Sequence, residues 1–245
     1  MRTSFTSAHM RLGRRRRQQG AALAAAVGLA VLAGTAACGG SGSPGDPLSG
    51  TSANQITTEA FANLKSASSV HIAGQMEGSG QQETVTATLG TTDCQGTFTN
   101  PSKGTYSVLT VSGSTYFSAG QAFWKGSGAT GSALTLLAGK YVKVGPSKST
   151  LDALGVMCHP SQMVGYNGTI TGMVSHGVTT FNGQKALHIT DSGDAAGIYV
   201  TDTSTPELLH MTAGSTDLTF SNFNAPLNLT APPANQTLDG KKYGF

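Results

Sequence analysis

The chain has 245 residues, of which 38% are hydrophobic and only 11% are charged, and its formal net charge is +3. All six arginines precede Cys38 and all twelve acidic residues follow it, so nine lysines leave residues 38–245 with a side-chain charge of −3. A domain that is mildly acidic and free of arginine lacks the basic surface that binds phosphate backbones. We therefore expect no nucleic-acid binding. Residues 38–245 are long enough to form one domain with a sizeable core.

The first 37 residues have the three parts of a secretory signal peptide. A basic run, Arg14 to Arg17, is followed by an uncharged apolar run from Ala21 to Ala33, and small residues then lead to Cys38. The apolar run is shorter than the roughly 20 residues that span a bilayer. We therefore expect residues 1–37 to be a cleaved signal peptide and not a membrane helix.

The small residues before Cys38 resemble a bacterial lipobox, although Thr35 stands where leucine is usual. This resemblance implies that the Cys38 thiol receives a lipid with acyl chains such as palmitate and becomes the first mature residue. The protein is then anchored to the outer face of the cell membrane. The alternative is an ordinary signal peptidase site beside an incidental cysteine. The arginine run suggests twin-arginine export, but Gln18-Gln19-Gly20 favours the Sec route.

Residues 38–54 are mostly Gly, Ser, Pro and Asp, which predicts a flexible tether that holds the domain off the membrane. The domain is expected to begin with a short amphipathic helix over 57–66. A threonine there can cap the free N–H groups, Glu59 favours the first turn, and Phe61 and Leu64 fall on one face.

From Ser69 the hydrophobic period changes to two, which predicts half-buried antiparallel strands with threonines on the solvent side. Asn182-Gly183 is the strongest hairpin signal. We expect ten or eleven strands, drawn from the alternating segments 69–73, 84–89, 97–99, 105–111, 114–117, 140–144, 178–181, 186–189, 197–201, 207–212, 217–220 and 227–230.

The middle of the chain predicts short helices within a long insertion between strands. Residues 132–138 and 149–155 each show an apolar face ended by glycine, and 161–166 is a third candidate. The apolar pair Phe123-Trp124 could be an exposed lid, but core is the better interpretation.

Cys94 and Cys158 remain once Cys38 is lipidated, and an even pair in an oxidising compartment predicts a disulfide. It would close a loop of 64 residues, for which loop-closure entropy gives about 4 kcal/mol. The alternative is a soft-metal site of Met157-Cys158-His159 with Cys94, but these residues lack a recognisable ligand spacing.

No catalytic signature is present. The chain has no Gly-x-Ser-x-Gly and no His-Glu-x-x-His, and its glycine-rich segments are typical of hairpin turns and not of phosphate loops. His188-x-x-Asp191 is the nearest approach to a catalytic pair, and a surface hydrogen bond explains it better. We therefore expect no catalytic residues, no cofactor and no metal site, with the histidines scattered at His71, His159, His176, His188 and His210.

Several short sequence segments occur in a fixed order along the chain. They are the lipobox, a Ser/Gly linker, a helix ending Ala-Asn-Leu-Lys-Ser, and the segments 69–74, 122–124, 138–144 and 218–233. Over residues 55–238 this order resembles the actinobacterial LppX/LprG-type envelope lipoproteins, which are related in shape to the LolA-like lipoprotein carriers. The resemblance implies an α+β, mainly antiparallel fold: a curved half-barrel with a few short helices on its concave face. We expect a single domain over 55–238, with 239–245 as a C-terminal tail.

The same resemblance implies an apolar cavity between sheet and helices that holds acyl chains. A curved sheet covered by few helices can leave such a space, although the same apolar pattern is produced by a packed core. The candidate lining is Phe61, Leu64, Ile72, Met76, Leu89, Val108, Leu134, Leu137, Met163, Met173 and Met211.

These observations favour a non-catalytic lipoprotein, monomeric, that binds a lipid, glycolipid or other acylated molecule at the cell envelope. The alternatives are a structural or protein-interaction lipoprotein with a packed core, and a metal-handling lipoprotein that uses Met and Cys residues. A connected apolar space distinguishes the first from the second.

Overall fold

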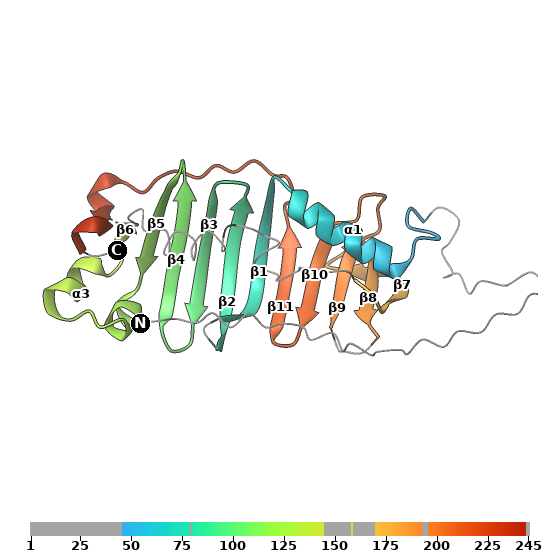
Figure 1. Ribbon diagram of the computed structural model, residues 1–245, viewed down its shortest axis with the longest axis horizontal. Coiled ribbons are helices and arrows are strands. Elements are labelled where there is room, and N and C mark those ends of the chain that lie inside the picture. The colour runs from blue at the N-terminus through green and yellow to red at the C-terminus, as the bar shows by residue number, and fades with distance from the viewer. Residues whose placement is uncertain (1–45, 79, 145–157, 159–169, 193–195, 244–245) are drawn as a thin grey trace, which may run out of the picture. The chain divides into compact units, whose positions relative to one another are not determined.

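The computed structural model describes residues 46–78, 80–144, 158, 170–192 and 196–243. In this part of the chain, 12 strands form one open sheet in the order β12-β6-β5-β4-β3-β2-β1-β11-β10-β9-β8-β7, accompanied by a few short helices (Figure 1). Every pairing is antiparallel except that of β12 with β6. The sheet is not closed, and the predicted α+β half-barrel class is confirmed.

The first half of the sheet follows the chain as a meander, because each strand pairs with the next. Its strands are β1 Ser69–Gly78, β2 Gln81–Gly90, β3 Cys94–Asn100, β4 Gly104–Val111, β5 Ser114–Ala119 and β6 Tyr141–Lys143. The second half returns to pair β11 with β1. Its strands are β7 Met173–Phe181, β8 Gln184–Asp191, β9 Gly197–Thr201, β10 Leu208–Ala213 and β11 Thr216–Ser221, and β12 Thr237–Asp239 joins the far edge.

The alternation sorts the side chains onto two faces. Ile72, Ala87 and Phe98 share one face, as cross-strand register requires, and all are at most 2% exposed. We call this the inner face. The opposite, outer face of the same strands carries Thr86 and Thr97. The predicted division between apolar and threonine-bearing faces is therefore confirmed.

Helix α1 (Ala53–Ser66) begins four residues before the predicted start. Ser52 is its N-cap, and a reciprocal capping box joins the Ser52 and Gln55 side chains to the backbone N–H groups. The sequence interpretation overlooked this box and started at the later threonine. Leu48, which lies in the predicted tether, is 6% exposed and packs in the core, so the packed domain begins before residue 55.

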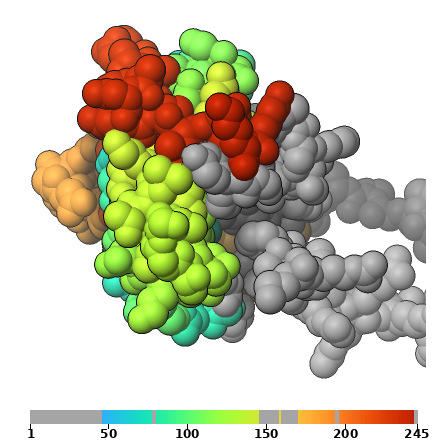
Figure 2. Space-filling view, turned by 90° about the vertical axis from the view of Figure 1, so that its left-hand side faces the viewer, coloured from blue at the N-terminus to red at the C-terminus, as the bar shows by residue number. Residues whose placement is uncertain are grey.

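Two short helices, α2 (Gln121–Gly126) and α3 (Gly131–Leu137), lie at the β6 end of the sheet. Two 3-10 turns, Ala234–Gln236 and Gly240–Tyr243, flank β12. Figure 2, which looks onto this end, shows the C-terminal segment in red against the yellow-green of α3 and β6. Ordered structure thus continues past 238, where the tail was predicted to start. The helices expected over 149–155 and 161–166 lie outside the described residues.

The strand predicted over 227–230 is wrong. Residues 222–233 run as an extended strap along the strand ends towards the C-terminus (Figure 1). Leu229 packs against Leu109, Val111 and Tyr116 on the outer face, which explains the apolar alternation. Pro226, Pro232 and Pro233 offer no N–H group to a strand ladder, so the segment forms no continuous ladder, although the Asn224 N–H donates a 2.9 Å hydrogen bond to the Ser69 carbonyl.

Candidate functional site

The inner face under α1 forms the main hydrophobic cluster. Ile56, Ala60 and Leu64 project from α1 and are at most 1% exposed, and they pack with strand residues such as Ile72 and Leu218. Two side chains of the helix fix its position. Asn54 Oδ1 accepts a hydrogen bond of 2.9 Å from the Met173 N–H, and Asn63 Nδ2 donates one of 2.8 Å to the Pro206 carbonyl. Helix α1 is therefore held over the second half of the sheet (Figure 1).

Most of the predicted cavity lining falls into two hydrophobic clusters, and Met163 lies outside the described residues. The main cluster contains Phe61, Leu64, Ile72, Leu89 and Met211, with the half-buried Met76 and Met173 packed against it. Leu134 and Leu137 belong to a second cluster near α2 and α3, while Val108 is 1% exposed on the inner face of β4. These residues are mostly buried, and their role as a ligand lining stays a prediction.

A row of aromatic rings continues from the main cluster to the second one. Phe98 stacks on Tyr106 at 5.1 Å between ring centroids, Tyr106 lies 5.9 Å from Phe117, and Phe117 meets Trp124 edge-on at 5.6 Å. Trp124 is 3% exposed and Phe123 is half-buried, so the prediction that this pair belongs to the core is confirmed. Such ring pairs each contribute about 0.5–1.5 kcal/mol beyond their buried area.

A buried carboxylate lies beside this aromatic row. Glu83 is 4% exposed on the inner face, and its two oxygens accept hydrogen bonds of 2.8 Å from Asn100 Nδ2 and from the Tyr106 hydroxyl. Burial and the neighbouring Glu83 carboxylate raise the pKa of Tyr106 above its ordinary value. Asn100 Oδ1 also accepts the Ser102 and Lys103 N–H groups, so these contacts fix the β3–β4 turn. The sequence interpretation missed the group because Glu83 stands at an apolar position of the alternation.

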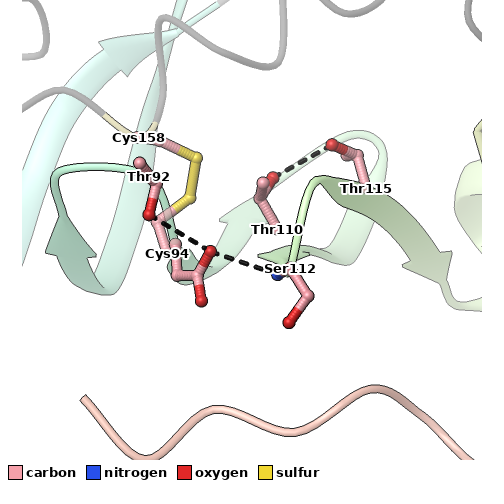
Figure 3. Close-up of a disulfide and its surroundings, with 7 residues drawn as sticks. Thr92, Cys94, Thr110, Ser112, Thr115 and Cys158 are labelled. Carbon is pink, nitrogen blue, oxygen red and sulfur yellow. Dashed lines mark hydrogen bonds between the residues drawn. A yellow bond between two sulfur atoms is a disulfide. The ribbon is translucent and has the colours of Figure 1, made fainter.

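Cys94 and Cys158 form the predicted disulfide (Figure 3). Cys94 opens β3 on the inner face, and Cys158 is 5% exposed in the main cluster. Beside the bond, Asp93 Oδ1 accepts hydrogen bonds from Thr92 Oγ1 and the Ser112 N–H, which ties two neighbouring turns together. The alternative of a soft-metal site that includes both sulfurs is wrong, because they are bonded to each other. The described residues also contain no group of three or more His, Cys, Asp or Glu side chains able to hold a metal.

The middle of the inner face lies between the two groups of helices. Figure 1 shows α1 across the β7–β11 side, while α3 lies at the β6 end, where α2 precedes it and packs against β4. Between them, β2 and β3 present Val85, Ala87 and Phe98, each at most 2% exposed. Cys158 is disulfide-bonded at this stretch of the face. A continuous layer of buried apolar side chains therefore joins the two clusters.

Two shallow pockets in the described part of the chain lie elsewhere, beside the C-terminal strap. One is bounded by Leu109, Tyr141 and strap residues 228–233, and the other by Tyr116, Lys143 and residues around β12. No residue of the predicted lining borders either pocket. Their walls belong to the outer face and the sheet edge, so they are separate from the inner apolar surface.

The outer face of β7 to β10 carries aromatic rings and histidines. His176 and His188 lie 4.9 Å apart between ring centroids, His188 stacks on Tyr199 at 4.6 Å, and Phe181 stacks on Tyr199 at 4.8 Å and on His210 at 5.1 Å. We call these five residues the histidine–aromatic row. At its end His210 Nε2 lies 2.8 Å from Asp217 Oδ1.

The expectation of scattered histidines is therefore wrong for three of them. His188 has His176 and Tyr199 as ring partners, and desolvation together with the charge of His176 lowers its pKa. The sequence interpretation paired His188 with Asp191, but an odd number of strand positions separates these residues and places them on opposite faces.

Histidine–threonine hydrogen bonds also occur on this face. His176 Nε2 lies 2.7 Å from Thr190 Oγ1, and His71 Nδ1 lies 3.2 Å from Thr88 Oγ1. In the described part of the chain neither imidazole is hydrogen bonded to a carboxylate that would orient it as a general base. The two pairs consequently form cross-strand contacts of the sheet and not a triad.

Comparison with known proteins gives little. No family model matches the chain, and no curated protein matches it. Among solved structures, the crystal structure of MucB matches 75% of this chain at 14% sequence identity, with a TM-score of 0.28, and the match spans 61% of the MucB chain. A likeness of this size carries no inference about function.

Proposed function

We propose that this protein is an exported lipoprotein, anchored to the outer face of the cell membrane through Cys38, that binds an acyl chain on the inner face of its sheet. The anchor rests on the signal anatomy of residues 1–37 and the lipobox-like residues before Cys38. None of the helices described, α1 to α3, is long and apolar enough to cross a membrane.

The observation that carries the binding proposal is the extent of the apolar inner face relative to its helical cover. In the part of the chain that the structure describes, twelve strands contribute to the sheet, whereas α1 has 14 residues, α2 has 6 and α3 has 7. Buried apolar side chains run from Met211 under α1 through Ala87 to Trp124 in α2. An apolar layer of this kind suits a flexible, apolar and unbranched ligand better than a polar one.

The proposed role needs no chemistry by the protein. In the described residues the buried carboxylate of Glu83 is occupied by Asn100 and Tyr106, and it fixes a turn. Binding would therefore be driven by removal of acyl surface from water, worth about 0.8 kcal/mol for each buried CH₂ group.

The test is native mass spectrometry of secreted residues 39–245, followed by spectra of the denatured protein. The proposal predicts additional mass of lipid size that disappears on denaturation, and displacement of a naphthyl probe by fatty acids. An unliganded monomer that takes up neither probe nor fatty acid would contradict it.

One observation favours the alternative of a protein-interaction module. Edge strand β7 contains no Asp, Glu, Lys or Arg and exposes Val174 and Val178 at 44% and 45%. Uncharged, exposed edge strands are templates for pairing with another chain. The same native spectra distinguish the cases, because masses of complexes without lipid would favour this alternative.

A further inference from the structure

The β7–β8 hairpin contains an irregularity that changes the direction of one histidine. Counting back from the Asn182–Gly183 loop, Phe181 pairs with Gln184 and Val178 with Leu187, but Ser175 pairs with Ile189. One extra residue is therefore accommodated between these pairs, so His176 and Gly177 together face His188. This is a β-bulge, in which two residues of one strand oppose one of its partner.

The bulge moves His176 from one face of the sheet to the other. Without it, the loop register would place His176 opposite Ile189, whose side chain is fully buried on the inner face. With it, His176 lies beside His188 on the outer face. Gly177 makes this possible because it has φ of +84°, a conformation that side chains disfavour. Bulges that redirect a side chain are typical of sheet edges and functional sites.

The two imidazoles lie at the separation that a shared metal ion requires. A metal–nitrogen distance of about 2.0–2.1 Å places the metal about 3.2 Å from each ring centroid. Two such ligands then have centroids about 4.5 Å apart at a right angle and about 5.2 Å apart at a tetrahedral angle. The observed separation of 4.9 Å falls between these values.

The surroundings suit a metal that prefers nitrogen ligands. Strand β7 contains no Asp or Glu, so no carboxylate of this strand would favour calcium or magnesium instead. Tyr199 stacks on His188 with an interplanar angle of 11° and holds the plane of that ring. A half-turn of either imidazole about its Cβ–Cγ bond places Nδ1 where Cδ2 was and Nε2 where Cε1 was and leaves the plane unchanged, so the stacking survives when a nitrogen turns to the ion.

We propose that His176 and His188 form an outer-face site for a divalent transition-metal ion of the imidazole-binding class, Cu²⁺, Ni²⁺ or Zn²⁺, with water as the remaining ligands. The site goes beyond the proposed lipid binding and does not depend on it, because it lies on the opposite face. It also differs from the Met and Cys site considered from the sequence, since no sulfur takes part.

The test is a calorimetric titration of Ni²⁺ into the mature lipoprotein, exported by its own signal and purified without a histidine tag. The proposal predicts one equivalent bound to the wild-type protein and at least a tenfold loss of affinity in each of His176→Gln and His188→Gln. His71→Gln is the matched control, because His71 lies on the same face with Thr88 as its partner. Its Ni²⁺ affinity should equal that of the wild type.

A second variant tests the role of the bulge itself. Gly177→Ala keeps both imidazoles, and a Cβ there meets no atom within 4 Å, so its effect acts through the backbone at φ +84°. We expect a loss of Ni²⁺ affinity smaller than that of His176→Gln. Ni²⁺ should also raise the melting temperature of the wild type but not of His176→Gln, because the ion would join β7 to β8. Absence of binding below 1 mM, or binding that survives both histidine substitutions, would overturn the proposal.

Discussion

The outer face of the sheet has two regions that differ in chemistry although their inner faces are alike. Over β2 to β4 it carries hydroxyl groups, which pair across strands as in Thr97 with Ser107 at 3.0 Å and Thr99 with Thr105 at 3.0 Å. Over β7 to β10 it carries the histidine–aromatic row. Opposite these residues, the inner faces of β2 to β4 and of β8 to β10 are mostly buried and apolar. The hydrophobic alternation therefore determines the fold, while the outer residues are free to differ.

The two regions also differ in regularity. From β1 to β5 the strand pairs keep one register along their whole length. The second half has a register shift between Ser175 and Val178 in β7 and another between Leu208 and His210 in β10. Both shifts adjoin residues of the histidine–aromatic row. We infer that the regular half provides stability and that departures from regularity mark the half with distinctive chemistry.

The largest effect should come from breaking the covalent link on the inner face. Replacing both cysteines in Cys94→Ser/Cys158→Ser frees a 64-residue loop in the unfolded chain, and we expect a loss of about 4 kcal/mol. Urea unfolding of the two proteins measures this difference. Equal stabilities would show that the cross-link does not support the inner face.

Neighbouring residues on β11 compare the two faces directly. Leu218 is fully buried on the inner face, so Leu218→Ala should cost about 2–5 kcal/mol through lost burial and a cavity. Thr219 lies on the outer face, where its hydroxyl donates a 2.9 Å hydrogen bond to the Ala73 carbonyl. Thr219→Ala should cost about 1 kcal/mol. Similar losses in the two variants would contradict the assignment of the faces.

The buried phenol of Tyr106 should give a smaller effect that depends on pH. Tyr106→Phe removes the hydrogen bond to Glu83 and should cost about 1–3 kcal/mol at neutral pH. The folded state raises the pKa of Tyr106, so the stabilisation it provides is present below pH 10 and is lost as the pH rises above that value. Urea unfolding at neutral and alkaline pH measures both effects. If the variant loses as much stability in alkali as the wild type, Tyr106 is not the responsible group.

The smallest effect concerns the histidine–aromatic row in acid. The pKa of His188 is lowered in the folded state by desolvation and by His176, whereas Tyr199, His210 and Asp217 are the other titratable groups along the row. The unfolded chain therefore binds more protons, and stability present above pH 6.5 is lost as the pH falls below it. His188→Gln should reduce this acid-side decrease in melting temperature. An unchanged pH profile would contradict the coupling.

Much of the fold could be predicted because the alternation of apolar residues with threonine has a direct physical meaning. Val70 and Ile72 are two positions apart, as are Val85 and Ala87. Each pair can be buried on one face only if its segment is an extended strand, in which alternate side chains share a face. The same alternation led to the wrong prediction of a strand over 227–230. Leu227 and Leu229 alternate with polar residues, but neighbouring prolines prevent a ladder of hydrogen bonds. The short parallel strand β12 has three residues and no distinctive pattern, so only its tertiary contact with β6 reveals it.

The candidate sites were less predictable because they depend on contacts between distant residues. Glu83 is hydrogen bonded to Asn100 and Tyr106, which are 17 and 23 positions away, and no local sequence pattern around Glu83 predicts these bonds. The pairing of His176 with His188 follows from the hairpin only when the bulge is included. Gly177 beside His176 was the available signal, since an isolated glycine within a strand can mark a bulge.

The most direct test of lipid binding on the inner face is photolabelling of the protein with a diazirine-bearing fatty acid, followed by mapping of the labelled residues. The account predicts saturable labelling of inner-face positions such as Val85, Ala87 and Val108, abolished by excess unlabelled fatty acid. The outer neighbours Thr84 and Thr86 on the same strand should stay unlabelled. Labelling that does not saturate, or that falls equally on the outer threonines, would contradict the proposed site.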